Sequence, residues 1–234
     1  RKKPSAAPLK ELFAFSKTFT VKFLKTASPV ILNELAWSLG MVLYKVVFAR
    51  MGTDYIAAAN VTEAIQSLFF IVFIGTANGS AILIGKKIGQ QQYASATDYA
   101  SGSLILGFIS GAVVGLVMIA ASRFIPMAFN VSQDIQAMAT RSLIVLGGLL
   151  SVKIFNLHSI TGVLRSGGDT RFSLFLELTG VWCIGVPLAF IGGLLLHLPL
   201  HLVYLLVSLE ELYKMLISGW RSVTGKWLND LTRE

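Results

Sequence analysis

The sequence predicts an all-α membrane protein built as a six-transmembrane-helix bundle. Its 234 residues are 54% hydrophobic and only 14% charged, whereas soluble domains carry about 25% charged residues. The apolar residues gather in runs of roughly 20 or more, the length needed to cross about 30 Å of hydrocarbon. These runs are nearly continuous rather than alternating, which favours helices over β-strands.

The six predicted spans follow one another along the chain. The second run is longer than a bilayer requires, so this helix begins at the interface or tilts. The fifth contains Pro187, where a proline removes a backbone hydrogen bond and should kink the helix. The spans are predicted near residues 29–49, 57–84, 100–121, 142–163, 172–195 and 200–219.

Glycines four residues apart predict where two of these helices pack closely. Little hydrophobic force acts between helices in lipid, so small residues that let backbones approach strengthen dispersion contacts. The third span has such a face at Gly107, Gly111 and Gly115. We expect the same of Gly75 and Gly79 on the second span.

The distribution of Lys and Arg predicts the orientation of the spans. Of the 20 basic residues, 15 fall on one side, counting the N-terminal segment, the loops near 86 and 165–171, and the region from 214 onwards. The other side has Arg50, Arg123 and Arg141, while Lys45 and Lys153 lie inside predicted helices. By the positive-inside rule, both ends of the chain are expected to be cytoplasmic. Because the net charge of +8 is concentrated at one membrane face, we expect no nucleic-acid partner.

The segment before the first span is basic and is expected to be a linker. The chain begins with Arg, and no signal peptide precedes the first apolar run, so residues 1–28 resemble the middle of a longer protein and we expect a fragment. Phe and Leu alternate with Lys over residues 9–25, a pattern typical of an amphipathic helix on the inner membrane surface. A basic linker that merely contains phenylalanines is the alternative.

Polar residues inside the spans identify a candidate cavity. Each ionisable residue there costs at least about 2.5–3.5 kcal/mol at the bilayer centre, so it should face water or a partner. Helical spacing places the candidates on three faces, belonging to the first, second and fourth spans. The predicted cavity residues are Asn33, Glu34, Trp37, Ser38, Met41, Asn60, Glu63, Lys153 and Asn156.

Two interpretations of this set remain open. In one, the three faces line a water-filled cavity where a carboxylate binds a cation or exchanges a proton. In the other, Glu34, Glu63 and the lysines form structural ion pairs or extend to the interface. Glu177, near the cytoplasmic end of the fifth span, is a weaker candidate for the cavity.

The sequence lacks the motifs of soluble catalytic sites. It has no H-E-x-x-H, no G-x-S-x-G and no P-loop, and its single cysteine, Cys183, excludes an internal disulfide. The histidines, at positions 158, 197 and 201, do not have metal-ligand spacing. We therefore expect no enzymatic activity, no catalytic residues, no metal site and no cofactor. Energy for transport would come from an ion gradient or another subunit.

Three stretches resemble one known family. They are "PVILNELAWSLGMVLYKVVFARMGTDYIAAANV", "GSAILIGKKIGQQQYASATDYA" and "GVLRSGGDTRFSLFLELTGVW". Their order and spacing are similar to the second half of a multidrug and toxic compound extrusion (MATE) transporter, of the Firmicutes-type bacterial members in particular. The resemblance runs from about residue 29 to 227.

The resemblance implies a twelve-helix transporter in the bacterial inner membrane, with two six-helix lobes related by a pseudo-two-fold axis. Such a protein exports small, lipophilic and often cationic drug-like compounds by alternating access, driven by inward flow of Na⁺ or H⁺. Residues 29–221 would form the C-terminal six-helix lobe and 222–234 a cytoplasmic tail. Residues 1–28 would be the inter-lobe linker, so the N-terminal lobe becomes the expected partner alongside membrane lipid.

The resemblance leaves the coupling ion open. Sodium-coupled members often carry an acidic residue in span seven and another in span ten. In this sequence the first position falls near Trp37, with Glu34 one turn earlier, and the corresponding fourth span has Lys153 and Asn156 but no carboxylate. Two other functions stay open as alternatives: a lipid-linked oligosaccharide flippase of the same superfamily and a non-transporting membrane scaffold.

Overall fold

The computed structural model describes residues 16–229, apart from the side chains of Phe19, Lys22 and Thr26. Every regular element within residues 16–229 is helical, which confirms the predicted all-α membrane fold. The first half contains the α-helices α2 (Lys17–Met51), α3 (Thr53–Gly89) and α4 (Tyr93–Ala121), followed by a short 3₁₀ turn, η1 (Ile125–Ala128).

The second half consists of helices interrupted by wider π-helical turns. The fourth predicted span is built from α5 (Gln133–Gly148), α6 (Leu150–Leu157) and the π-helical η2 (His158–Leu164). The fifth runs through α7 (Thr170–Glu177), η3 (Leu178–Gly185), α8 (Val186–Phe190) and η4 (Ile191–Leu195). The last consists of α9 (Leu200–Val207) and α10 (Leu209–Val223).

Each predicted span lies within one of these helical segments. The segments differ in whether they are long and apolar enough to cross a bilayer. Four helices among the described residues are long and apolar enough to cross a bilayer, and a fifth span results if α5 and α6–η2, bent by 55°, are counted as one. The last segment is different because α10 carries four charged residues, Glu210, Glu211, Lys214 and Arg221. Pro187 lies between the π-helical η3 and η4 in a span that remains continuous from Thr170 to Leu195.

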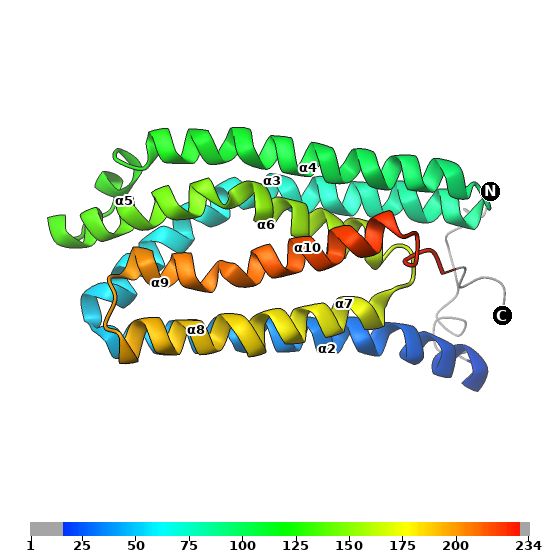
Figure 1. Ribbon diagram of the computed structural model, residues 1–234, viewed down its shortest axis with the longest axis horizontal. Helices are drawn as coiled ribbons and strands as arrows, with labels where there is room; N and C mark the ends of the chain where they lie inside the picture. Colours follow the sequence, from blue (N-terminus) through cyan, green and yellow to red (C-terminus); the bar gives the residue numbers. More distant parts are fainter. Residues whose placement is uncertain (1–15, 230–234) are drawn as a thin grey trace, which may run out of the picture.

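The long helices run side by side along one axis and form two groups (Figure 1). In one group α2 packs on the α7–α8 segment, and in the other α3 and α4 pack on α5 and α6. The α9–α10 segment lies between the groups, with α10 in contact with α6 and η3. Large apolar side chains such as Leu68, Ile82 and Leu116 are about 70% exposed on the outside, as expected of a surface that faces lipid.

Glycines provide the closest helix contacts on α4. Gly107, Gly111 and Gly115 are buried, and a side-chain Cβ at Gly111 or Gly115 would meet backbone atoms of the neighbouring α6 and α5. The predicted packing face on the third span is therefore confirmed. The same prediction for Gly75 and Gly79 is wrong, because no neighbouring atom lies within 4 Å of a Cβ placed there. Glycine spacing alone does not determine which side of a helix meets a partner.

The two ends of the described chain lie at the same end of the bundle (Figure 1). Helix α2 begins at Lys17, so the later part of the predicted linker is continuous with the first span through Pro29. The earlier part, up to residue 15, lies outside the described residues. Beyond α10, Trp227 is fully buried against Gly167, which fixes the start of the predicted tail to the loop before α7. Residues 230–234 of that tail lie outside the described residues.

Candidate functional site

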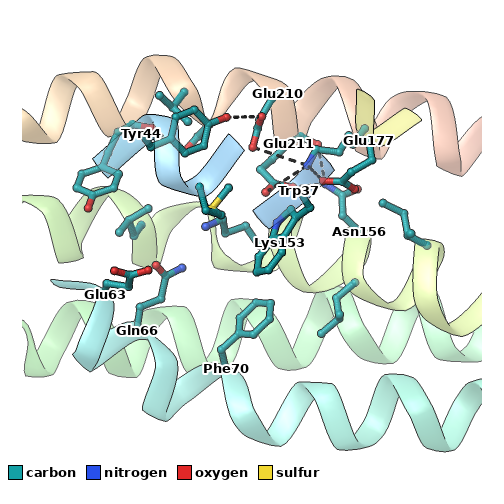
Figure 2. Close-up of a pocket in the computed structure, with 18 of the residues that line it drawn as sticks. Trp37, Tyr44, Glu63, Gln66, Phe70, Lys153, Asn156, Glu177, Glu210 and Glu211 are labelled. Atoms are coloured by element: carbon teal, nitrogen blue, oxygen red, sulfur yellow. Dashed lines mark hydrogen bonds and ion pairs between the residues drawn. The ribbon is translucent and has the colours of Figure 1, made fainter. Parts of the chain in front are cut away.

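A cavity of about 580 Å³, lined by charged, polar and aromatic side chains, opens between the two groups of helices. Its walls come from α2, α3, α6–η2 and the α9–α10 segment (Figure 2). Eight of the nine predicted residues line it: Asn33, Glu34, Trp37, Met41, Asn60, Glu63, Lys153 and Asn156. Ser38 is not a lining residue, since it is rotated about 100° around the helix from Trp37 and its side chain is exposed elsewhere.

Two of the predicted carboxylates are held in ion pairs at opposite parts of this cavity. Glu34 Oε1 lies 2.7 Å from Arg165 Nη2, and the same guanidinium donates a hydrogen bond of 3.0 Å to Asn33 Oδ1. Glu63 Oε2 lies 2.8 Å from Lys45 Nζ. The structure thus places Glu34 and Glu63 at the cavity and in ion pairs, and cation binding by either carboxylate stays a prediction.

A buried charge cluster on α10 is the main feature that the sequence analysis missed. Lys214 Nζ lies 3.1 Å from Glu177 Oε1, 3.7 Å from Glu210 Oε1 and 3.9 Å from Glu211 Oε1. The Lys214 side chain is only 4% exposed. Because Lys214 was counted among the cytoplasmic loop charges, that assignment is wrong, and the 15 residues on that side become 14.

The spacing of the residues on α10 contained the missing signal. Glu210 and Glu211 precede Lys214 by four and three residues, so all three lie on one helical face, where opposite charges attract. Hydropathy alone places such charges at the membrane interface. In the folded chain, Glu177 from the end of α7 completes the cluster, so Lys214 is neutralised inside the bundle.

Two polar residues from other helices hold the carboxylates of this cluster. Tyr44 Oη, on α2, donates a hydrogen bond of 2.7 Å to Glu210 Oε2. Asn156 Nδ2, on α6, donates to the Glu211 backbone oxygen at 2.8 Å and to Glu211 Oε2 at 2.7 Å. Figure 2 shows these side chains converging near Glu177 and Lys153, apart from Glu63 and Gln66.

The cavity combines these charges with aromatic surfaces. Trp37 and Phe70 line it, with Tyr44, Phe48 and Tyr204 further along the wall. Carboxylates attract a positive charge, and aromatic faces bind organic cations through the ring quadrupole. Within residues 16–229, no group of three or more His, Cys, Asp or Glu side chains is arranged to hold a metal ion. The cavity thus combines aromatic surface with five carboxylates and four basic side chains.

Fold and cavity together define a class: a multi-pass membrane protein whose helices surround a cavity lined by charged and aromatic side chains. The MatE family model matches residues 29–191. The chain belongs to the MatE family.

Individual relatives match in sequence and in structure. The chain is 28% identical over 218 residues to the uncharacterized transporter YisQ of Bacillus subtilis, a match covering 92% of this chain and 47% of that protein. It is 29% identical over 175 residues to a probable multidrug resistance protein NorM of Deinococcus radiodurans, which covers 67% of this chain and 38% of that one. The chain spans about half the length, or less, of these relatives.

Solved structures of transporters share the fold. An outward-facing multidrug resistance MATE family transporter of the MOP superfamily superposes with a TM-score of 0.81 at 18% identity. A MOP superfamily transporter from Pyrococcus furiosus superposes with a TM-score of 0.82, also at 18% identity. Both matches cover 91% of this chain and 47% of the other. At this identity the likeness supports the fold, again over about half of each transporter.

Proposed function

We propose that this chain is the C-terminal lobe of a cation-coupled multidrug antiporter. It would export lipophilic and often cationic compounds in exchange for Na⁺ or H⁺, by alternating access. Its family membership and the name of its Deinococcus relative, a probable multidrug resistance protein, support this proposal. The asymmetric basic charge supports a bacterial inner-membrane protein with both ends of the chain cytoplasmic.

The observation that carries the proposal is the composition of the cavity. Its volume of about 580 Å³ falls within the range of small-molecule sites, about 300–1,000 Å³. Five carboxylates outnumber four basic side chains on its walls, and aromatic rings lie among them, so both the net charge and the ring faces favour a lipophilic cation. Arg165 is the one arginine among the lining residues, which gives an anionic substrate such as a lipid-linked oligosaccharide little support.

The proposal predicts that this chain alone does not transport. Repeat-built transporters bind their substrate at the interface of two halves and move one half against the other. We expect ethidium efflux only when this chain is expressed together with a complementary six-helix lobe, in cells that lack other efflux pumps. Efflux should stop when the driving gradient is removed, by a protonophore or by omission of Na⁺. Efflux by the chain alone, or efflux that survives collapse of both gradients, would contradict the proposal.

Glu34→Gln tests the role of the first span in that complete transporter. The Glu34 side chain is 56% exposed, and an ion pair of this exposure contributes up to about 1 kcal/mol. We therefore expect the initial rate of ethidium efflux to fall by up to about fivefold. Asp54→Asn, which removes an exposed carboxylate from the first turn of α3 outside the cavity, is the matched control. Efflux unchanged in Glu34→Gln would remove Glu34 from the mechanism.

A further inference from the structure

The charges that line the cavity do not balance. Five carboxylates line it, those of Glu34, Glu63, Glu177, Glu210 and Glu211. Four cations line it, those of Lys45, Lys153, Arg165 and Lys214. Two of the carboxylates are matched one to one, Glu34 by Arg165 and Glu63 by Lys45. Three carboxylates around α10 are therefore left with two lysines, an excess of one negative charge.

The contacts assign this excess to Glu210. Lys214 lies nearest to Glu177, at 3.1 Å, and farther from Glu210, at 3.7 Å. The carboxylate of Glu211 is bound by Asn156 and interacts electrostatically with Lys153 as well. Glu210 retains a neutral hydroxyl, that of Tyr44, as its closest partner at 2.7 Å. Since Glu210 is only 3% exposed, leaving its charge uncompensated is costly.

An unsatisfied oxygen gives independent support for a missing cation. Asn156 is 3% exposed, and its Oδ1 has no hydrogen-bond partner, although its Nδ2 donates twice to Glu211. Buried polar atoms are almost always satisfied, and each exception is explained by a bound water, a bound ion or a functional role. An amide oxygen beside carboxylates is a ligand for a cation or for the water that accompanies a proton.

A glycine makes room for the central pair of this site. A Cβ at Gly185, on η3, would overlap both the Tyr44 hydroxyl and the Glu210 carboxylate. Only a residue without a side chain lets α2 and α10 bring these two groups together at that position. The groups that face Glu210 are thus Tyr44 from α2, Gly185 from η3 and Glu177 from α7. Glu211 and Lys214 lie on its own helix, and Lys153 and Tyr204 line the same cavity.

We propose that the α10 cluster binds one monovalent cation, H⁺ or Na⁺, at Glu210, and that this is the ion exchanged for substrate. The exchange of this cation for substrate rests on the proposed antiport, whereas binding of the cation does not. Binding of the cation neutralises Glu210, which changes both its attraction to Lys214 and its hydrogen bond with Tyr44. The hydrogen bond links α2 to α10, so cation binding acts on the contact between two walls of the cavity.

Cation binding to the full chain in lipid nanodiscs tests this site directly. In one arm, pH is varied without Na⁺, and infrared spectroscopy follows the protonated carboxyl band. In the other, Na⁺ is titrated at high pH with Trp fluorescence as the signal, since Trp37 lines the cavity. We expect one of the two arms to show a single bound cation, which Glu210→Gln abolishes and Asp54→Asn retains. Binding in neither arm, or binding that Glu210→Gln leaves intact, would overturn the inference.

A second variant separates a binding role from a purely structural one. Tyr44→Phe keeps the ring and removes the hydroxyl that stabilises the free carboxylate of Glu210. A hydrogen bond to a charged group is strong enough to change an equilibrium by about tenfold or more, so cation affinity should rise by about tenfold. If affinity stays unchanged while the variant folds, Glu210 is not the binding carboxylate.

The binding readout does not depend on drug transport. If the chain binds its cation at Glu210 but the complete transporter exports nothing, the result supports the cation site and contradicts the proposed antiport. If the complete transporter shows cation-coupled efflux that Glu210→Gln leaves unchanged in rate and in cation dependence, the antiport stands and this site is overturned.

Discussion

Lys214→Met is expected to lower the free energy of unfolding by about 3–5 kcal/mol, because removing one member of a buried ionic cluster leaves its partners uncompensated. Lys214 is in ion-pair distance of Glu177, Glu210 and Glu211. Methionine preserves much of the side-chain volume, so the loss of stability comes from removing the positive charge rather than from creating a cavity. Unfolding by SDS in mixed micelles, followed by tryptophan fluorescence, measures the change.

Lys45→Met is the matched control for Lys214→Met. Lys45 pairs with Glu63 at 2.8 Å, but both side chains are about half exposed, and such pairs contribute about 0–1 kcal/mol. Combining Lys214→Met with Glu210→Gln removes one carboxylate that the lysine no longer balances, so part of the stability should return. If Lys214→Met and Lys45→Met lowered the free energy of unfolding equally, the α10 cluster would contribute no more to stability than an exposed ion pair.

Hydropathy and helical periodicity predicted the architecture and most of the cavity wall. Apolar runs of membrane length have few alternatives to helix, because every backbone group must be satisfied within the segment. Side chains three and four residues apart share a face, and Asn33, Glu34 and Trp37 line the cavity together. Ser38 does not line the cavity, because it lies at the edge of that face, where a rotation of about 100° per residue turns the next side chain away.

The partners of those side chains depend on tertiary contacts that one sequence does not contain. Arg165 follows its partner Glu34 by more than a hundred residues and was assigned to a loop, yet it lines the cavity. Glu177 and Lys214 come from different helices and meet only when α7 and α10 pack. Charges near the ends of a predicted span can belong to either the interface or the interior, and hydropathy does not distinguish the two.

Gly115→Val is expected to lower the free energy of unfolding by about 1–3 kcal/mol, because overpacking a close helix contact forces backbone or rotamer shifts. A Cβ at Gly115 would overlap the carbonyl oxygen of Gly147 on α5. Backbone atoms of a packed helix cannot move aside as a flexible side chain does. The same SDS unfolding measurement applies, and crosslinking between α4 and α5 reports the separation of the two helices.

Gly79→Val makes the same substitution on a face without neighbours. No atom lies within 4 Å of a Cβ at Gly79, and surface substitutions of this kind usually change stability by no more than about 0.5 kcal/mol. Both glycines belong to the same four-residue spacing pattern, so the pair of variants separates the sequence motif from the contact. If Gly79→Val were as destabilising as Gly115→Val, the spacing itself would determine stability, and the close approach of α4 to α5 would not explain the loss.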